Sequence, residues 1–242
     1  MDFQKTGIFF CLTALFFSAC TARITGDLEA GGSGEFEVSA SLMPRISLLI
    51  RSLSAALGDG TAPEHIIDGE AIARSMSAAP GIASVSFRNT GPAAIEGPVK
   101  ISRLEDFLSA ASGSGGARKG FITLEQASPG GHCTITIDRE SGPEILSLIS
   151  ADVSDYLSAL MAPIATGERL SKEEYFELVA SIYGRPLADE ISRGSIRAFI
   201  NFPGPVSAVQ GGTWTGRRAE FTVPLADLLV LETPLVYEVW WK

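Results

Sequence analysis

Two hydrophobic periodicities alternate along the chain, and their order limits the folds that it can adopt. Near both ends of the chain, apolar residues recur at every second position, which predicts half-buried β-strands. Elsewhere they recur at three- and four-residue spacing, which predicts amphipathic helices. Strands, then helices, then strands again predict an α+β fold, in which a mostly antiparallel sheet has helices packed on one face.

The predicted strands begin with a hairpin close behind the twentieth residue. Ile24 and Leu28 share one face of its first half, and Val38 and Ala40 share one face of its second half. Between the halves, the segment 31–34 reads Gly-Gly-Ser-Gly and supplies the positive φ values that a tight turn needs. Further strands are predicted at 82–88, 95–101, 121–125, 133–138, 196–202, 219–223 and 235–241.

The predicted helices begin at capping residues and end at glycine or proline. Asp68 is an N-cap candidate. Ser171 with Glu174 forms a capping box, and Gly184 ends the helix that this box begins. Helices are predicted at 44–57, 69–79, 102–110, 141–149, 153–161 and 171–184, with a short one before Gly194.

Proline and glycine also mark interruptions. Pro98 lacks an N–H group, so strand 95–101 is predicted to lie at a sheet edge or to carry a bulge. The segment 89–92 is predicted to be a turn, and the glycine-rich stretch 112–120 a flexible loop.

The first twenty residues, MDFQKTGIFFCLTALFFSAC, have the pattern of an export signal. Lys5 gives a short charged region, and the apolar run 7–17 follows it. At about 1.5 Å per residue, this run is too short to cross an apolar bilayer core of about 30 Å. Small residues Ser18 and Ala19 then precede Cys20, as signal-peptide cleavage requires.

This stretch resembles the lipobox of bacterial lipoproteins, although Phe17 stands where the usual pattern has leucine. The resemblance implies a signal peptide over 1–19, cleavage before Cys20, a diacylglycerol thioether on its sulfur and acylation, for example by palmitate, of its new amino group. Residues 20–242 would then form a single lipid-anchored α+β domain. An ordinary secretory signal and an uncleaved anchor are the alternatives.

The net charge and the cysteine content limit the partners and the covalent bonds that the chain can have. The net charge is −9, and it stays at that value when the signal removes one acid and one base. This surplus of acid opposes binding to nucleic acid, whose affinity rests on neutralising phosphates, and we expect no such partner.

With Cys11 lost and Cys20 acylated, Cys133 has no disulfide partner. It alternates with Ile135 and Ile137, which predicts a buried strand thiol rather than a nucleophile.

Motifs for catalysis or metal binding are missing from the sequence. His65 and His132 are its two histidines, and His132 and Cys133 would point to opposite faces of a strand. The sequence holds no Gly-x-Ser-x-Gly elbow, and the segment 113–119 lacks the order of a phosphate loop. We therefore expect no catalytic residue, no cofactor and no metal site.

Tryptophan and arginine provide the candidate ligand-binding residues. Trp214 lies close to the pair Arg217 and Arg218, which could contact a lipid headgroup or an acidic partner. A solvated turn is the alternative interpretation. Trp240 and Trp241 are neighbours on a predicted strand and must face opposite sides, so one packs inside while the other covers a helix, lines a groove or lies near the bilayer.

Two segments resemble the LppM-like envelope lipoproteins. Residues 196–228 read IRAFINFPGPVSAVQGGTWTGRRAEFTVPLADL, similar to the closing hairpin of that family, and 23–42 are similar to its early hairpin. Two departures are that the family often has a C-terminal transmembrane helix, whereas this chain ends at Lys242, and often a tryptophan where Phe221 stands. The resemblance implies an α+β domain outside the cytoplasmic membrane, with lipid or amphiphile binding as its role.

From these patterns we expect a non-enzymatic envelope lipoprotein that binds a lipid or another amphiphile. It would be held by the lipid on Cys20 at the cell membrane or the outer membrane, facing the periplasm or the exterior. A structural or assembly lipoprotein that acts through protein contacts is the alternative, and a hydrolase comes third.

Overall fold

The computed structural model describes residues 21–57, 64–104, 106–107, 122–127, 130–141, 157–158 and 160–242. The predicted signal peptide, Cys20 and the loop at 112–120 lie outside these residues. Most of the helices predicted at 102–110, 141–149 and 153–161 lie outside them too.

Within the described residues the strands form two sheets. Their bounds are β1 (Thr21–Leu28), β2 (Gly34–Ser41), β3 (Ile82–Val85), β4 (Arg88–Gly91), β5 (Ala94–Ile101), β6 (Ile122–Ala127), β7 (Gly130–Ile137), β8 (Ser195–Asn201), β9 (Val206–Gln210), β10 (Gly212–Thr215), β11 (Arg218–Pro224) and β12 (Leu235–Trp241). The larger sheet has the order β10-β11-β8-β1-β2-β5-β3, with β4 also paired to β5, and the smaller has the order β6-β7-β12-β9. The pair β1 and β8 is parallel, and the other described pairs are antiparallel.

The helices are α2 (Pro44–Leu57), α3 (Gly69–Ser77), α7 (Pro163–Thr166), α8 (Lys172–Tyr183), α9 (Arg185–Arg193) and α10 (Leu225–Val230). Their buried side chains form one core with the inward residues of the larger sheet, such as Ile24, Val38 and Val99. The α+β prediction is therefore confirmed, with most strand pairs antiparallel and helices packed on one face. Among the described helices, none is long and apolar enough to cross a membrane.

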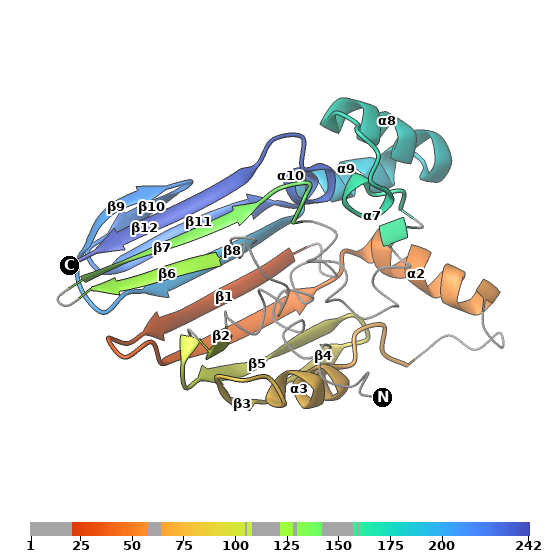
Figure 1. Ribbon diagram of the computed structural model, residues 1–242. Coiled ribbons are helices and arrows are strands. Elements are labelled where there is room, and N and C mark those ends of the chain that lie inside the picture. The colour runs from red at the N-terminus through yellow and green to blue at the C-terminus, as the bar shows by residue number, and fades with distance from the viewer. Residues whose placement is uncertain are drawn as a thin grey trace, which may run out of the picture.

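The smaller sheet packs against the same face of the larger sheet, away from the helices (Figure 1). Leu28 and Ala219 from the larger sheet meet Val206, Val239 and Trp241 from the smaller one in a second apolar cluster. One face of the larger sheet is thus covered by helices at one end and by strands at the other.

The first hairpin follows the predicted pattern. Strands β1 and β2 pair from Thr21 opposite Ser41 to Leu28 opposite Gly34, and the turn between them contains Gly32 at a φ of 75°. The apolar residues of both strands are buried, whereas the residues between them point to the opposite face of the sheet. This hairpin brings β1 into the middle of the larger sheet, where β8 lies on its other side.

Strand β5 corrects one prediction. It lies between β2 on one side and β3 and β4 on the other, so Pro98 is not on an edge strand. The carbonyl of Pro98 accepts from Ser86 N at 3.1 Å, and a residue's N and O point to the same side of a strand. The side of Pro98 that lacks an N–H therefore faces the gap between β3 and β4. Because Pro98 offers no donor there, the predicted strand 82–88 ends early, at Val85.

The strands β9 and β10 were not predicted as strands. Gly211 lies between them at a φ of 76°, and it turns the chain from the smaller sheet into the larger one. A Cβ at this position would lie 2.8 Å from the carbonyl oxygen of Val236. The glycine pair at 211–212 is thus a corner that joins the two sheets, rather than a simple turn.

Candidate anion-binding site

The second face of the larger sheet is not covered by any described helix or strand, and it is polar. We call it the open face; it carries the side chains that alternate with the buried ones, such as Arg23 and Thr25 on β1 and Arg197 and Phe199 on β8. Because β1 and β8 are parallel and in register, Arg23 lies beside Arg197 and Thr25 beside Phe199. A sheet that is packed on one face and solvated on the other has this alternation of apolar and polar residues.

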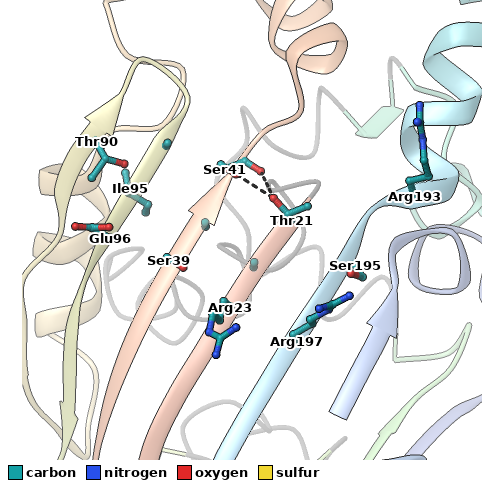
Figure 2. A pocket seen from close by; sticks show the side chains of 13 residues that line it. Thr21, Arg23, Ser39, Ser41, Thr90, Ile95, Glu96, Arg193, Ser195 and Arg197 are labelled. Carbon is teal, nitrogen blue, oxygen red and sulfur yellow. Dashed lines mark hydrogen bonds between the residues drawn. The ribbon is translucent and has the colours of Figure 1, made fainter. Parts of the chain in front are cut away.

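A groove of about 480 Å³ lies on the open face, at the end where β1 begins (Figure 2). The residues that line it include the hydroxyl residues Thr21, Ser39, Ser41, Thr90 and Ser195, together with Glu96 and the arginines Arg23, Arg193 and Arg197. The hydroxyl oxygens of Thr21 and Ser41 are 2.9 Å apart and form a hydrogen bond across the first hairpin. Five strands and the end of α9 contribute to this groove.

The three arginines of the groove are exposed, and no carboxylate of the described residues is paired with them. Nε of Arg193 donates to the carbonyl oxygen of Asp189 at 2.9 Å, and the guanidinium carbon of Arg23 lies 4.2 Å from the ring centroid of Phe199. Within the described part of the chain, none of the three forms an ion pair with a carboxylate, and Arg197 has no polar partner. The groove is therefore locally positive in an acidic protein.

Most of the described carboxylates of the open face have partners of their own. Glu96 lines the groove but is paired with Arg88, which lies on β4. The other pairs are Glu35 with Lys100 at 2.6 Å, Glu220 with Arg218 at 3.6 Å, and Asp27 with Asn201 at 3.0 Å. Glu37 also lies on this face, but it is not part of the groove. The acids thus leave the guanidinium groups of the groove uncompensated.

The structure does not bring the predicted ligand-binding residues into one cluster. Trp214 is 46% exposed on the edge strand β10, on the face opposite Arg218. Nε of Arg217 donates to the carbonyl oxygen of Phe202 at 2.7 Å. Arg218 lies on the open face, where its guanidinium carbon is 4.9 Å from the ring centroid of Phe199. Its backbone is opposite Asn201, at the far end of β8 from the groove.

The prediction for His132 and Cys133 is confirmed, because they face opposite sides of β7. The thiol points between the sheets, and burial raises the pKa of Cys133 from 9.0 to about 12. On the outer face, the ring of His132 stacks on Trp240 at 4.5 Å between centroids and 7° between planes, and its Nε2 is 3.0 Å from Oγ1 of Thr134. Among the described residues, no group of His, Cys, Asp or Glu side chains is arranged to hold a metal ion.

Trp240 and Trp241 point to opposite sides of β12, as predicted. Trp241 is buried and lies 4.9 Å from Phe202 between ring centroids, whereas Trp240 is half-buried on the outer face. Neither residue lines the groove.

A second, smaller depression of about 350 Å³ has a structural explanation. Lys172 at the start of α8 donates to Asp227 of α10 at 2.7 Å, and this contact raises the pKa of its ammonium group. The backbone N of Lys172 donates to Glu232 at 3.2 Å. These contacts tie two helices together, so we place the candidate site at the arginine-lined groove.

The fold and the groove define an α+β protein of two sheets, with a cationic site on the open face of the larger one. No known protein family and no curated protein matches the chain. Among solved structures it is similar to the folded domain of LppM from Mycobacterium tuberculosis, determined by NMR. That similarity has a TM-score of 0.40 and 10% sequence identity, and covers 100% of this chain and 93% of that one.

Proposed function

We propose that this chain is a non-enzymatic, lipid-anchored envelope protein that binds the anionic headgroup of an amphiphile in the arginine-lined groove. The observation that carries this proposal is a set of three guanidinium groups that have no carboxylate partner among the described residues, those of Arg23, Arg193 and Arg197. Guanidinium groups bind carboxylate and phosphate through paired hydrogen bonds, and the hydroxyl groups of the groove can donate to the remaining oxygens.

The size and position of the groove support a headgroup as the ligand. Its volume of about 480 Å³ is in the usual range for small-molecule sites. Thr21 lines the groove and directly follows Cys20, the residue for which the sequence predicts a lipid anchor. At about 3.3 Å per residue, Arg23 is within roughly 10 Å of Cys20 along the chain. An anchor there would hold the groove at headgroup level and raise the effective concentration of membrane ligands.

The proposal can be tested with the full chain in micelles of a neutral detergent. Phosphatidylglycerol added to the micelles should raise the midpoint of thermal unfolding, whereas phosphatidylcholine, which has no net charge, should not. At a lipid excess of about a hundred Kd, the expected shift is about 5 to 10 °C. Because the groove is exposed, the shift should shrink as NaCl is added.

Two variants locate the binding. Arg197→Gln should reduce the shift, because it removes one of the three charges of the groove. Arg185→Gln removes an equally exposed arginine of α9 outside the groove and should leave the shift intact. An equal shift in both variants would place the lipid elsewhere and contradict the proposed site.

A further inference from the structure

Two arginines of the groove lie side by side on neighbouring strands. Arg23 of β1 and Arg197 of β8 are register partners in the parallel pair, and both side chains are exposed on the open face. Adjacent strands are about 4.8 Å apart, and like charges at directly paired positions destabilise a sheet. The protein therefore places two like charges at paired positions in the middle of its larger sheet.

No described carboxylate forms an ion pair with either arginine, although Glu37 lies diagonal to Arg23 on β2. Opposite Arg23 on β2 lies the neutral Ser39, and Glu96 is already paired with Arg88. Arg193 adds a third positive charge to the same groove from the end of α9. The chain as a whole is acidic, with 28 acids against 19 lysines and arginines. A local concentration of positive charge departs from this composition, and such departures are typical of functional sites.

From this charge concentration, and resting on the proposed function, we infer that the groove selects a headgroup that bears a diphosphate. A carboxylate or a phosphodiester brings a single negative charge, and a phosphomonoester about −1.5 to −2 at pH 7. A terminal diphosphate carries more charge than these and has two tetrahedral groups. Arg23 and Arg197 can each take one of them through paired hydrogen bonds, and Arg193 can close the site.

Phe199 prepares the site for this ligand. Its ring lies between Arg23 and Arg218, at 4.2 and 4.9 Å from their guanidinium carbons. The stacking restricts the side chain of Arg23 before any ligand arrives, which lowers the entropic cost of binding. The same diphosphate chemistry occurs in soluble molecules and in membrane lipids, and the experiment separates these two sources.

Thermal unfolding and titration of the full chain in neutral detergent micelles, at low salt and without divalent metals, test the inference. Inorganic pyrophosphate should bind and raise the midpoint, and it should bind at least roughly tenfold more tightly than dimethyl phosphate or acetate. Farnesyl diphosphate in the micelles is the lipid arm. Tighter binding than pyrophosphate identifies a lipid source, and equal binding a soluble one; both results support the diphosphate.

Arg197→Gln provides a second, independent readout. Without ligand, its unfolding midpoint should equal or exceed that of the unaltered chain, because the like charge at the position paired with Arg23 is gone. With pyrophosphate, it should show little or no shift. Arg185→Gln, outside the groove, should match the unaltered chain in both measurements.

The outcomes separate the two proposals. Equal affinity for pyrophosphate and dimethyl phosphate would overturn the diphosphate selectivity but leave an anion-binding groove. A pyrophosphate shift that persists in Arg197→Gln, or a lower midpoint of this variant without ligand, would also overturn the inference. If neither these anions nor phosphatidylglycerol bind, both the diphosphate selectivity and the proposed function are wrong.

Discussion

At the scale of single residues, two side chains, those of Glu190 and Cys133, show how strongly the surroundings determine the chemistry of a group. Glu190 of α9 is 8% exposed, and its Oε1 accepts from the backbone N of Arg45 at 2.8 Å and of Ile46 at 3.2 Å. These donors belong to the first turn of α2, so a carboxylate from a distant helix satisfies groups that the helix itself leaves unpaired. No capping signal near Pro44 predicts this contact, because the partners are far apart in sequence.

Replacing Glu190 should therefore reduce stability. Glu190→Ala leaves the buried N–H of Ile46 and the part-buried N–H of Arg45 without an acceptor, which should lower the free energy of unfolding by about 1–3 kcal/mol in a urea titration. Glu190→Gln keeps an acceptor oxygen and should lower the free energy of unfolding by a smaller amount. Glu177→Ala, an exposed change on α8, is the matched control and should have little effect. Equal stability of Glu190→Ala and the control would contradict the capping role.

Cys133 should be unreactive in the folded protein. Because burial raises the pKa of its thiol to about 12, almost no thiolate exists at pH 8, and a disulfide reagent should label it only after unfolding. The folded state favours the protonated thiol, so its contribution to stability is present below pH 9 and is lost as the pH rises towards 12. A full chain with Cys11→Ser and Cys20→Ser isolates this thiol, and rapid native labelling at pH 8 would contradict its burial.

At the scale of elements, local sequence signals predicted the regular parts of the fold. The capping box of α8 is present: the hydroxyl of Ser171 accepts from Glu174 N at 3.2 Å, and Ser171 N donates to the Glu174 carboxylate at 2.8 Å. Strand β12 and the first hairpin also follow their alternation. The strands β9 and β10, which were not predicted, are short and flank Gly211. A glycine with a positive φ is expected in a tight turn and in a corner between sheets alike, so the sequence does not distinguish the two.

The corner at Gly211 gives a test of this element. Gly211→Ala forces a side chain to a φ of 76° and places its Cβ close to the Val236 carbonyl, so the free energy of unfolding should fall by about 1–3 kcal/mol. Gly31→Ala lies in an open part of the first turn, with nothing within 4 Å of the added Cβ. Urea titrations of both variants should show a loss for Gly211→Ala alone; equal losses would contradict the corner.

At the scale of the whole molecule, the candidate site depends on a pairing that has no local signal. The alternation of β1 and β8 places Arg23 and Arg197 on the polar face of each strand, and this much is readable from the sequence. Their meeting requires β1 and β8 to be parallel neighbours, although most of the chain lies between them. The predicted ligand-binding residues lie close together in the sequence, yet their side chains have different neighbours; they are Trp214, Arg217 and Arg218.

The anchor itself can be tested separately from the groove. Cys20→Ser should abolish incorporation of a labelled fatty acid and release the chain from the membrane fraction, because the thioether lipid needs the sulfur. Arg197→Gln should keep the label and the membrane association. Unchanged retention of the Cys20→Ser chain would show that another segment holds it there.

The position of β1 also has a mechanical consequence. Its first residue, Thr21, directly follows the predicted anchor, and the strand is held between β2 and β8 from Thr21 to Asp27 (Figure 1). A pull between an anchored Cys20 and the domain would run along β1 and load the hydrogen bonds of both ladders in shear, all at once. Peeling a strand from a sheet edge breaks such bonds one after another and needs far less force. A chain tethered in this way should resist extraction by tension more strongly than its thermodynamic stability alone implies.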